Sequence, residues 1–357
     1  MLNTIAVVPN YTEMLTAPAV IFQFLYVFTF LLHIIFVNLT LGGIFSILLC
    51  KYIYKTYNDS VYNSIAHDLS FINTYNISLT VTTAIAPLLF IQILYDKFFY
   101  SSSIIIAYYW LSIIFAIIIA YYFNYIYKYK LFYLKFRIAG GTIFMVIVFI
   151  LFLYTTFMLV SNTLLSVNPE IWKEQYKNIN FLNIPTIIPR YLHFLIGSIA
   201  LNGIFICIYS KARKSLNENI KTKMFILGKN MFIYATLLQF IVGFWFLFSH
   251  KKMIWLNIVQ GYGLILIILT VLFSLYIIYL FIKNGSLLLI TIFGILTLIL
   301  MVILRRLTEV YYLEPYLKNL KFVSHYQFSA LAMFLILFII MLVLFAYLFK
   351  CIHKNRI

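Results

Sequence analysis

Nine apolar runs constrain this chain more than any other feature of its sequence. A helix crosses a bilayer with about 20 apolar residues, and the runs cover roughly 18–50, 72–95, 102–126, 138–165, 188–210, 224–249, 254–282, 286–304 and 327–350. The chain has 357 residues, 64% of them hydrophobic, and no polar stretch long enough to fold as a separate domain. We therefore predict an all-α polytopic membrane protein with one integral membrane domain over 1–357, in which helices 1–4 span about 18–165 and helices 5–9 about 188–350.

The distribution of lysine and arginine predicts the orientation in the membrane. One set of loop ends carries 16 of the 26 basic residues, whereas the other carries 10 together with six of the nine acids. Cytoplasmic loops are enriched in Lys and Arg, so we expect the N-terminus outside and the C-terminus in the cytoplasm. The net charge of +17 thus reflects membrane topology, and nucleic acid is not expected as a partner.

Four of the six histidines fall at one depth, near the predicted outer face. His33 lies 18 residues before Lys51, which is about 27 Å along a helix. His193 follows the outer end of helix 5, His250 ends helix 6 and His325 begins helix 9. An ionisable residue inside a membrane is costly and indicates function, and histidines converging from several helices are typical of haem ligation.

The residues around these histidines favour the same interpretation. His193, Gly197 and Ala200 share one helix face, as do His325, Ser329 and Ala332. Small side chains beside a histidine would leave a slot for a flat macrocycle, although they also mark close helix packing. Arg190, one turn outward from His193, is a candidate partner for a haem propionate or a headgroup anchor.

Two stretches resemble subunit I of the cytochrome bd quinol oxidases. Phe22-Gln23-Phe24 followed by residues 33–42 (HIIFVNLTLG) is similar to the first helix of that family, where the motif is H-x-x-F-V-P-L-T-L-G. Tyr191-Leu192-His193 resembles the helix 5 segment of the family. The resemblance implies that His33 ligates a haem of the high-spin pair and that His193 ligates the low-spin haem b.

The chain also departs from the family pattern. Residues 110–117 (WLSIIFAI) contain no acid where the family has proton-path glutamates, and Val259 stands where a methionine ligand is expected before G-x-G. The glutamate expected before Arg305 is missing, and the quinol-binding loop is reduced to a few residues around Lys251. The chain therefore looks like a divergent, bd-like membrane cytochrome b, a class associated with multihaem c-type cytochromes, in the bacterial inner membrane.

From these features we predict a respiratory subunit with one or two haem b groups that exchanges electrons between the quinone pool and an extracytoplasmic c-type cytochrome, within a complex of further membrane subunits. His193 and His33 are the first candidate iron ligands. His325 and His250, then Met253 and Met301, are candidates for the opposite position. For quinone or quinol, the predicted site is Arg305, Arg306 and Glu309 at the outer interface, where a carboxylate would accept protons; the alternative is an interfacial anchor.

Two other functions stay open at this point. One is a bd-type terminal quinol oxidase that keeps a high-spin haem with unfamiliar ligands. The other is a haem-free membrane scaffold or transporter. Transporters usually show paired inverted halves around a polar site at the midplane, and the sequence has no such symmetry and almost no charge at that depth.

Overall fold

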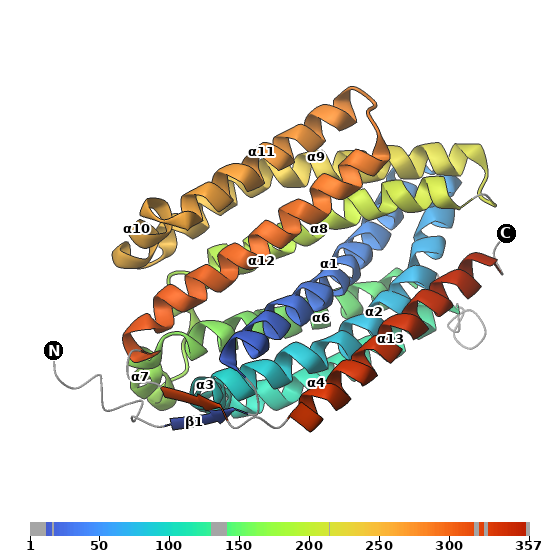
Figure 1. The fold of residues 1–357 in the computed structure, drawn as a ribbon. Coiled ribbons are helices and arrows are strands. Elements are labelled where there is room, and N and C mark those ends of the chain that lie inside the picture. Colours follow the sequence, from blue (N-terminus) through green and yellow to red (C-terminus); the bar gives the residue numbers. More distant parts are fainter. Residues whose placement is uncertain are drawn as a thin grey trace.

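In the computed structural model, the described residues are 12–15, 18–129, 141–213, 215–317, 321–324 and 328–354. Nine long helices run side by side in a single bundle (Figure 1). They are α1 (Ala19–Tyr57), α2 (Ser60–Leu94), α4 (Ala107–Lys128), α6 (Thr142–Ser166), α8 (Ile187–Ala212), α9 (Glu218–Ser249), α11 (Tyr262–Ile282), α12 (Leu287–Leu317) and α13 (Phe328–Lys354).

Short elements gather at one end of the bundle. Figure 1 shows α3 (Asp96–Ile105), α7 (Trp172–Lys177), α10 (Lys252–Gln260) and strand β1 (Thr12–Leu15) there. Two 3₁₀ turns, Pro169–Ile171 and Phe181–Asn183, flank α7. We name this the outer end because the basic-residue count predicts that it faces outside; the opposite end, with the α8–α9 connection and the end of α13, is the inner end.

Strand β1 pairs in parallel with β2 (Lys321–Ser324), with Thr12 opposite Lys321 and Leu15 opposite Ser324. This two-stranded sheet is the one addition to the predicted all-α fold among the described residues. It joins the segments that precede α1 and α13. A long-range strand pair carries no local periodicity over so few residues, so the apolar pattern did not predict it.

Helix α1 lies at the centre of the packing. It packs most extensively against α2 and also contacts α8, α6 and α12, while α8 and α9 form the second closely packed pair. The largest buried cluster joins α1, α2, α4, α6, α8 and α9, with Ile44, Ile47 and Ile206 fully buried. A second cluster lies at the outer end around Tyr26, Tyr95, Phe98 and Tyr312.

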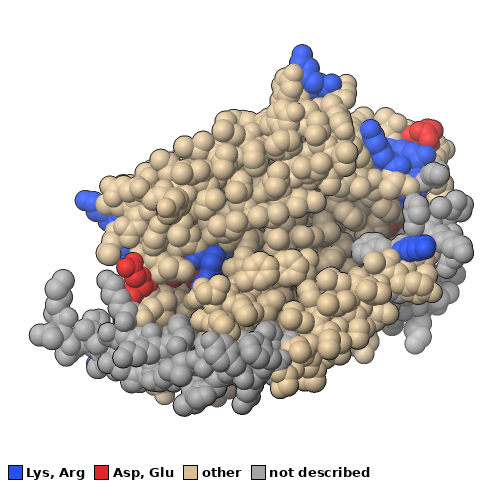
Figure 2. All heavy atoms as spheres, viewed as in Figure 1, with Lys and Arg blue, Asp and Glu red and all other residues tan. Residues whose placement is uncertain are grey.

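The outer surface of the bundle is apolar. Eight helices in the described part are long and apolar enough to cross a membrane, and α13 contributes a shorter described apolar stretch, Ala332–Tyr347. Large hydrophobic side chains on α4, α9, α11 and α13 are exposed. Figure 2 shows charged side chains mainly toward the two ends of the face drawn, with a broad uncharged surface between them. The protein is therefore a multi-pass membrane protein, and the predicted fold class is confirmed.

The helix bounds differ from prediction in two places. The predicted run 254–282 is broken at Gly261, which has φ −111° and ψ −161° and separates α10 from α11. Helix α12 continues past the predicted end at 304 to Leu317, because Arg305 and Arg306 pair with Glu309 within the helix.

Candidate functional site

His33 on α1 is held by the neighbouring helix. Its Nδ1 lies 3.1 Å from the carbonyl oxygen of Thr80 on α2. A carbonyl only accepts hydrogen bonds, so Nδ1 is the donor and Nε2 of the neutral ring keeps its lone pair. Histidines that ligate metals are usually oriented by such a bond from the other ring nitrogen. The structure therefore presents His33 in the form that a ligand needs.

His193 on α8 has a buried ring nitrogen without a partner. No hydrogen bond reaches its Nδ1, and the Oε1 atom of Gln239 on α9 is likewise buried and unpaired. Gln239 Nε2 donates to the His193 carbonyl oxygen at 2.8 Å. A buried polar atom without a partner costs about 1–3 kcal/mol, so such an atom calls for a physical explanation, for which a ligand is one possibility.

Gly243 on α9 lies directly beside the His193 ring. A Cβ atom at Gly243 would lie 3.3 Å from His193 Cε1, closer than most side-chain contacts. At Gly197, one turn below His193, an added Cβ would meet only Gln239 Nε2, at 3.4 Å. The absence of a side chain at Gly243 therefore lets the imidazole lie close to α9, and the macrocycle slot stays a prediction.

His250, directly after α9, is buried, with 7% of its surface exposed. Its Nδ1 is 2.9 Å from the hydroxyl oxygen of Tyr312 on α12. Burial, and secondly the charge of Arg190, lower the pKa of His250 to about 4. The ring is therefore neutral at pH 7, with one nitrogen engaged by Tyr312.

Aromatic rings connect His193 with the outer end. The ring centroids are 5.7 Å apart from His193 to Phe246, 4.8 Å from Phe246 to His250 and 5.6 Å from His250 to Tyr312. We call these four residues the aromatic file. Lys251, beside His250, lies over the Tyr312 ring and forms an ion pair with Glu170.

A buried charged cluster lies beside this file. Arg305 and Arg306 form ion pairs with Glu309, at 3.2 and 3.1 Å, one to each carboxylate oxygen. Arg305 also donates to the Tyr26 hydroxyl at 3.3 Å, and Arg306 donates to that of Tyr95. Only 6% of the Glu309 side chain is exposed. The carboxylate is thus enclosed between α12, α1 and the α2–α3 junction, while the side chains of Arg305 and Arg306 are partly exposed.

Arg190 adds a third cation to this cluster. It interacts electrostatically with Arg305 and Glu309, and it forms no ion pair or hydrogen bond through its side chain within the described residues. Three guanidinium groups are therefore balanced by one carboxylate. Buried charges are normally paired, so an excess of two positive charges favours an anionic ligand beside Arg190.

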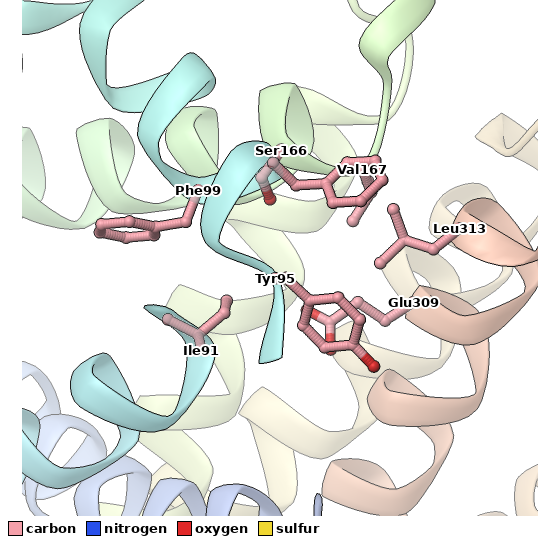
Figure 3. A pocket seen from close by; sticks show the side chains of 8 residues that line it. Ile91, Tyr95, Phe99, Ser166, Val167, Glu309 and Leu313 are labelled. Atoms are coloured by element: carbon pink, nitrogen blue, oxygen red, sulfur yellow. The ribbon is translucent and has the colours of Figure 1, made fainter. Parts of the chain in front are cut away.

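Figure 3 shows Glu309 and Tyr95 at a small cavity lined also by Ile91, Phe98, Phe99, Ser166, Val167 and Leu313. Its volume is about 10 Å³, which is room for about one water molecule. A quinone ring does not fit this cavity, although water can reach the carboxylate.

The remaining predicted ligands differ in their placement. His325 lies outside the described residues. Met253 is 64% exposed. Among the described side chains, no three from His, Cys, Asp and Glu lie close enough to hold a metal ion together.

The sequence placed Tyr312 beside the charged cluster, but it did not single out Tyr26 or Tyr95 as parts of the site. The chain has 30 tyrosines, and a tyrosine that orients an arginine has no distinguishing local pattern. Gln239 did carry a signal, because it shares a helix stripe with Gly243, Phe246 and His250.

Comparison with solved structures identifies the architecture. The structure of bd oxidase from Geobacillus thermodenitrificans superposes with a TM-score of 0.73, covering 96% of this chain and 98% of that chain at 15% sequence identity. The chain has the fold of a bd oxidase chain. No protein-family model and no curated protein matches the sequence. The fold predicted from the bd-like motifs is therefore confirmed over nearly its whole length.

Proposed function

We propose that this chain is a divergent bd-like membrane cytochrome b, a haem b-containing subunit of a respiratory complex in the bacterial inner membrane. It would transfer electrons between the quinone pool and an extracytoplasmic, multihaem c-type cytochrome. The observation that carries this proposal is the buried Nδ1 atom of His193, which has no partner, with glycine on the facing helix, in a chain with the fold of a bd oxidase.

The residues present fit haem b. Bound haem supplies an iron that is reversibly oxidised and reduced by one electron. His193 and His33 would hold haem iron, and the Thr80 carbonyl orients the His33 ring. His250, through its remaining ring nitrogen, and His325 are candidates for an opposite ligand, and the number of haems is one or two.

The charged cluster fits the carboxylates of the same cofactor. Arg190, one turn from His193, has no anionic partner of its own, while both oxygens of Glu309 are engaged by Arg305 and Arg306. A haem propionate beside Arg190 would supply the missing negative charge through charge-assisted hydrogen bonds. In this arrangement Arg305 and Arg306 hold the Glu309 carboxylate in place by their ion pairs with it.

A quinone site at Arg305, Arg306 and Glu309 stays a prediction. The ion pairs and the small cavity support it less than the propionate role, because both Glu309 oxygens are already paired with arginines and the cavity is too small for a quinone ring. A quinone head group reaching this region from the lipid would have to displace one arginine.

The aromatic file supports electron exchange at the outer end. His193 is connected through Phe246 and His250 to Tyr312 by packed rings, and Lys251 lies at the end of this file. A c-type cytochrome docked at the outer end would be close to Tyr312. The chain would work with this partner and with other membrane subunits.

A bd-type terminal oxidase is the second candidate, favoured by the fold itself. Dioxygen reduction to water consumes protons, and Glu309 is the one acidic side chain that is buried in the described part of the chain. Helix α4 has no acid in its span, in agreement with the sequence. This scarcity of buried acids favours electron transfer over oxygen reduction, and a haem-free scaffold or transporter is the third candidate.

A reduced-minus-oxidised spectrum with a pyridine haemochrome assay on purified protein, repeated with carbon monoxide, separates the candidates. We expect a b-type spectrum that carbon monoxide leaves unchanged, because two axial ligands exclude it. A shift with carbon monoxide would favour the oxidase. Absence of haem from protein purified with its partner subunits would leave the scaffold or transporter.

A further inference from the structure

A groove at the outer end lies away from the histidines and arginines described above. It is lined by Ser101, Ile104 and Ile105 of α3 and by Trp172, Lys173, Tyr176 and Lys177 of α7, and its volume is about 400 Å³. The two short helices contact each other. The groove is therefore a built feature between two packed elements, and none of its residues belongs to the candidate haem site.

Trp172 forms a rigid part of the groove wall. Its indole Nε1 donates to the Leu165 carbonyl oxygen at 2.8 Å, and its ring packs on Phe98 with centroids 6.3 Å apart. Only 7% of Trp172 is exposed. The wall is thus fixed before any ligand binds, which reduces the entropic cost of binding.

The polar rim carries two cations without counter-ions. Lys173 and Lys177 are four residues apart on α7 and exposed, and neither forms an ion pair or hydrogen bond through its side chain in the described structure. Glu174, between them, is also exposed and unpaired. The rim therefore has a net positive charge of one, and two lysines are free to bind an anion.

The other side of the groove is continuous with the lipid-facing surface. Ile104 is 66% exposed, and the next helix, α4, continues with Tyr108 at 91% and Leu111 at 57% exposed. Tyr108 and Leu111 project from the membrane-spanning helix α4, where acyl chains cover them, and Ile104 at the end of α3 adjoins this surface. An occupant of the groove consequently meets aliphatic side chains on one side, aromatic rings in the middle and ammonium groups on the other.

We propose that this groove binds an anionic glycerophospholipid. The phosphate and glycerol head would lie between Lys173 and Lys177 beside Tyr176, and the acyl chains would descend along Ile104 and α4. Aromatic and basic side chains at the membrane boundary are the groups that recognise lipid head groups. A water-soluble anion would use the lysines but leave the apolar side uncovered.

Native mass spectrometry of the purified protein titrated with phosphatidylglycerol tests this site. We expect the double variant K173Q/K177Q to bind it about 30-fold more weakly, since each lysine near a head group contributes about 1 kcal/mol. The matched control K252Q/K283Q removes the same charge from two exposed lysines outside the groove and should bind like the parent protein. Equal binding of phosphatidylcholine by the parent protein, or an equal loss in both double variants, would overturn the proposal.

A second measurement identifies the occupant in the membrane. With a photoreactive benzoylphenylalanine in place of Tyr176, which is 75% exposed, irradiation of native membranes should label phospholipid. Labelling of another polypeptide would mean that a protein subunit covers the groove and would refute the lipid site. If inorganic phosphate alone competes with phospholipid for labelling, the groove is a simple anion site, and the lipid proposal is likewise refuted. None of these results depends on haem.

Discussion

The α8–α9 pair uses glycine in two different ways along its length. In the inner half, a Cβ added at Gly203 would lie 2.6 Å from the Gly228 carbonyl oxygen and 2.8 Å from the Phe232 nitrogen. In the outer half, a Cβ at Gly197 would meet only a side-chain nitrogen, at 3.4 Å, and Gly243 faces the His193 ring. The inner glycines bring two backbones together, whereas the outer glycines face side chains, those of Gln239 and His193.

This difference separates two roles of small residues that the sequence alone does not distinguish, namely helix packing and contact with a candidate ligand. Small residues on a membrane helix usually serve helix packing, and at Gly203 and Gly228 they do. The outer half shows looser contacts where a buried ring nitrogen and a buried amide oxygen lack partners. The inner end is stabilised by paired charges, such as Arg213 with Asp68, while the outer end has an unbalanced excess of cations.

The largest effect should follow from removing the imidazole in the outer half. His193→Ala is expected to lose one b-type haem, because no other nitrogen replaces the ligand. The pyridine haemochrome content per protein measures this loss. His67→Ala at the inner end, where the ring packs on Phe71, is the matched control and should keep the full content. Unchanged haem in His193→Ala would end the proposed role of this residue.

Neutralising the only carboxylate in the charged cluster should have the next largest effect. Glu309→Gln leaves Arg305 and Arg306 without a counter-ion in a buried position, so we expect a loss of about 3 kcal/mol in the free energy of unfolding. Denaturation followed by circular dichroism in detergent reports it. Glu218→Gln removes an exposed carboxylate from its pair with Lys221 and should change stability by less than about 1 kcal/mol. Similar losses in the two variants would contradict the burial argument.

The two kinds of glycine can be compared directly by adding one methyl group to each. Gly203→Ala forces α8 away from α9 and should cost about 1–3 kcal/mol. Gly197→Ala meets ordinary contacts and gains helix propensity, so no loss of stability is expected. Melting temperatures in the same detergent decide between these outcomes. Equal destabilisation at both sites would show that the outer half is packed as tightly as the inner half.

The smallest effect concerns a paired charge at the inner end. The hydrogen bond from Lys223 lowers the pKa of the Asp59 carboxyl, with a further contribution from the Val61 amide. A lowered folded-state pKa means that the stabilisation is present above the unfolded-state pKa of about 3.8 and is lost as the pH falls through the folded-state value.

Asp59→Asn keeps the helix cap but removes the charge. We expect a small decrease in melting temperature at pH 7 that disappears in acid and in high salt. A decrease of the same size at all pH values would assign the effect to packing instead of charge.

The sequence predicted those parts of the fold that depend on local patterns. Apolar length gave the nine helices, and helical rise placed His33 and His193 within the bundle. The pattern missed the break at Gly261 because apolar residues continue on both sides of the short segment Gln260–Gly263. It also missed that Glu309 is enclosed, since depth along one helix does not reveal which other helices surround it. Tyr26 and Tyr95 approach the arginines from distant parts of the chain, and no local signal reports such contacts.

The strand pair at the outer end has a consequence for biogenesis. About 300 residues separate β1 from β2, and at roughly 5–20 residues per second a ribosome needs on the order of 15–60 s to make that stretch. During this interval β1 is translocated without its partner strand, so pairing becomes possible only after α12 has been inserted. Formation of the β1–β2 pair is therefore a late step of membrane insertion, after which only α13 follows in the described chain.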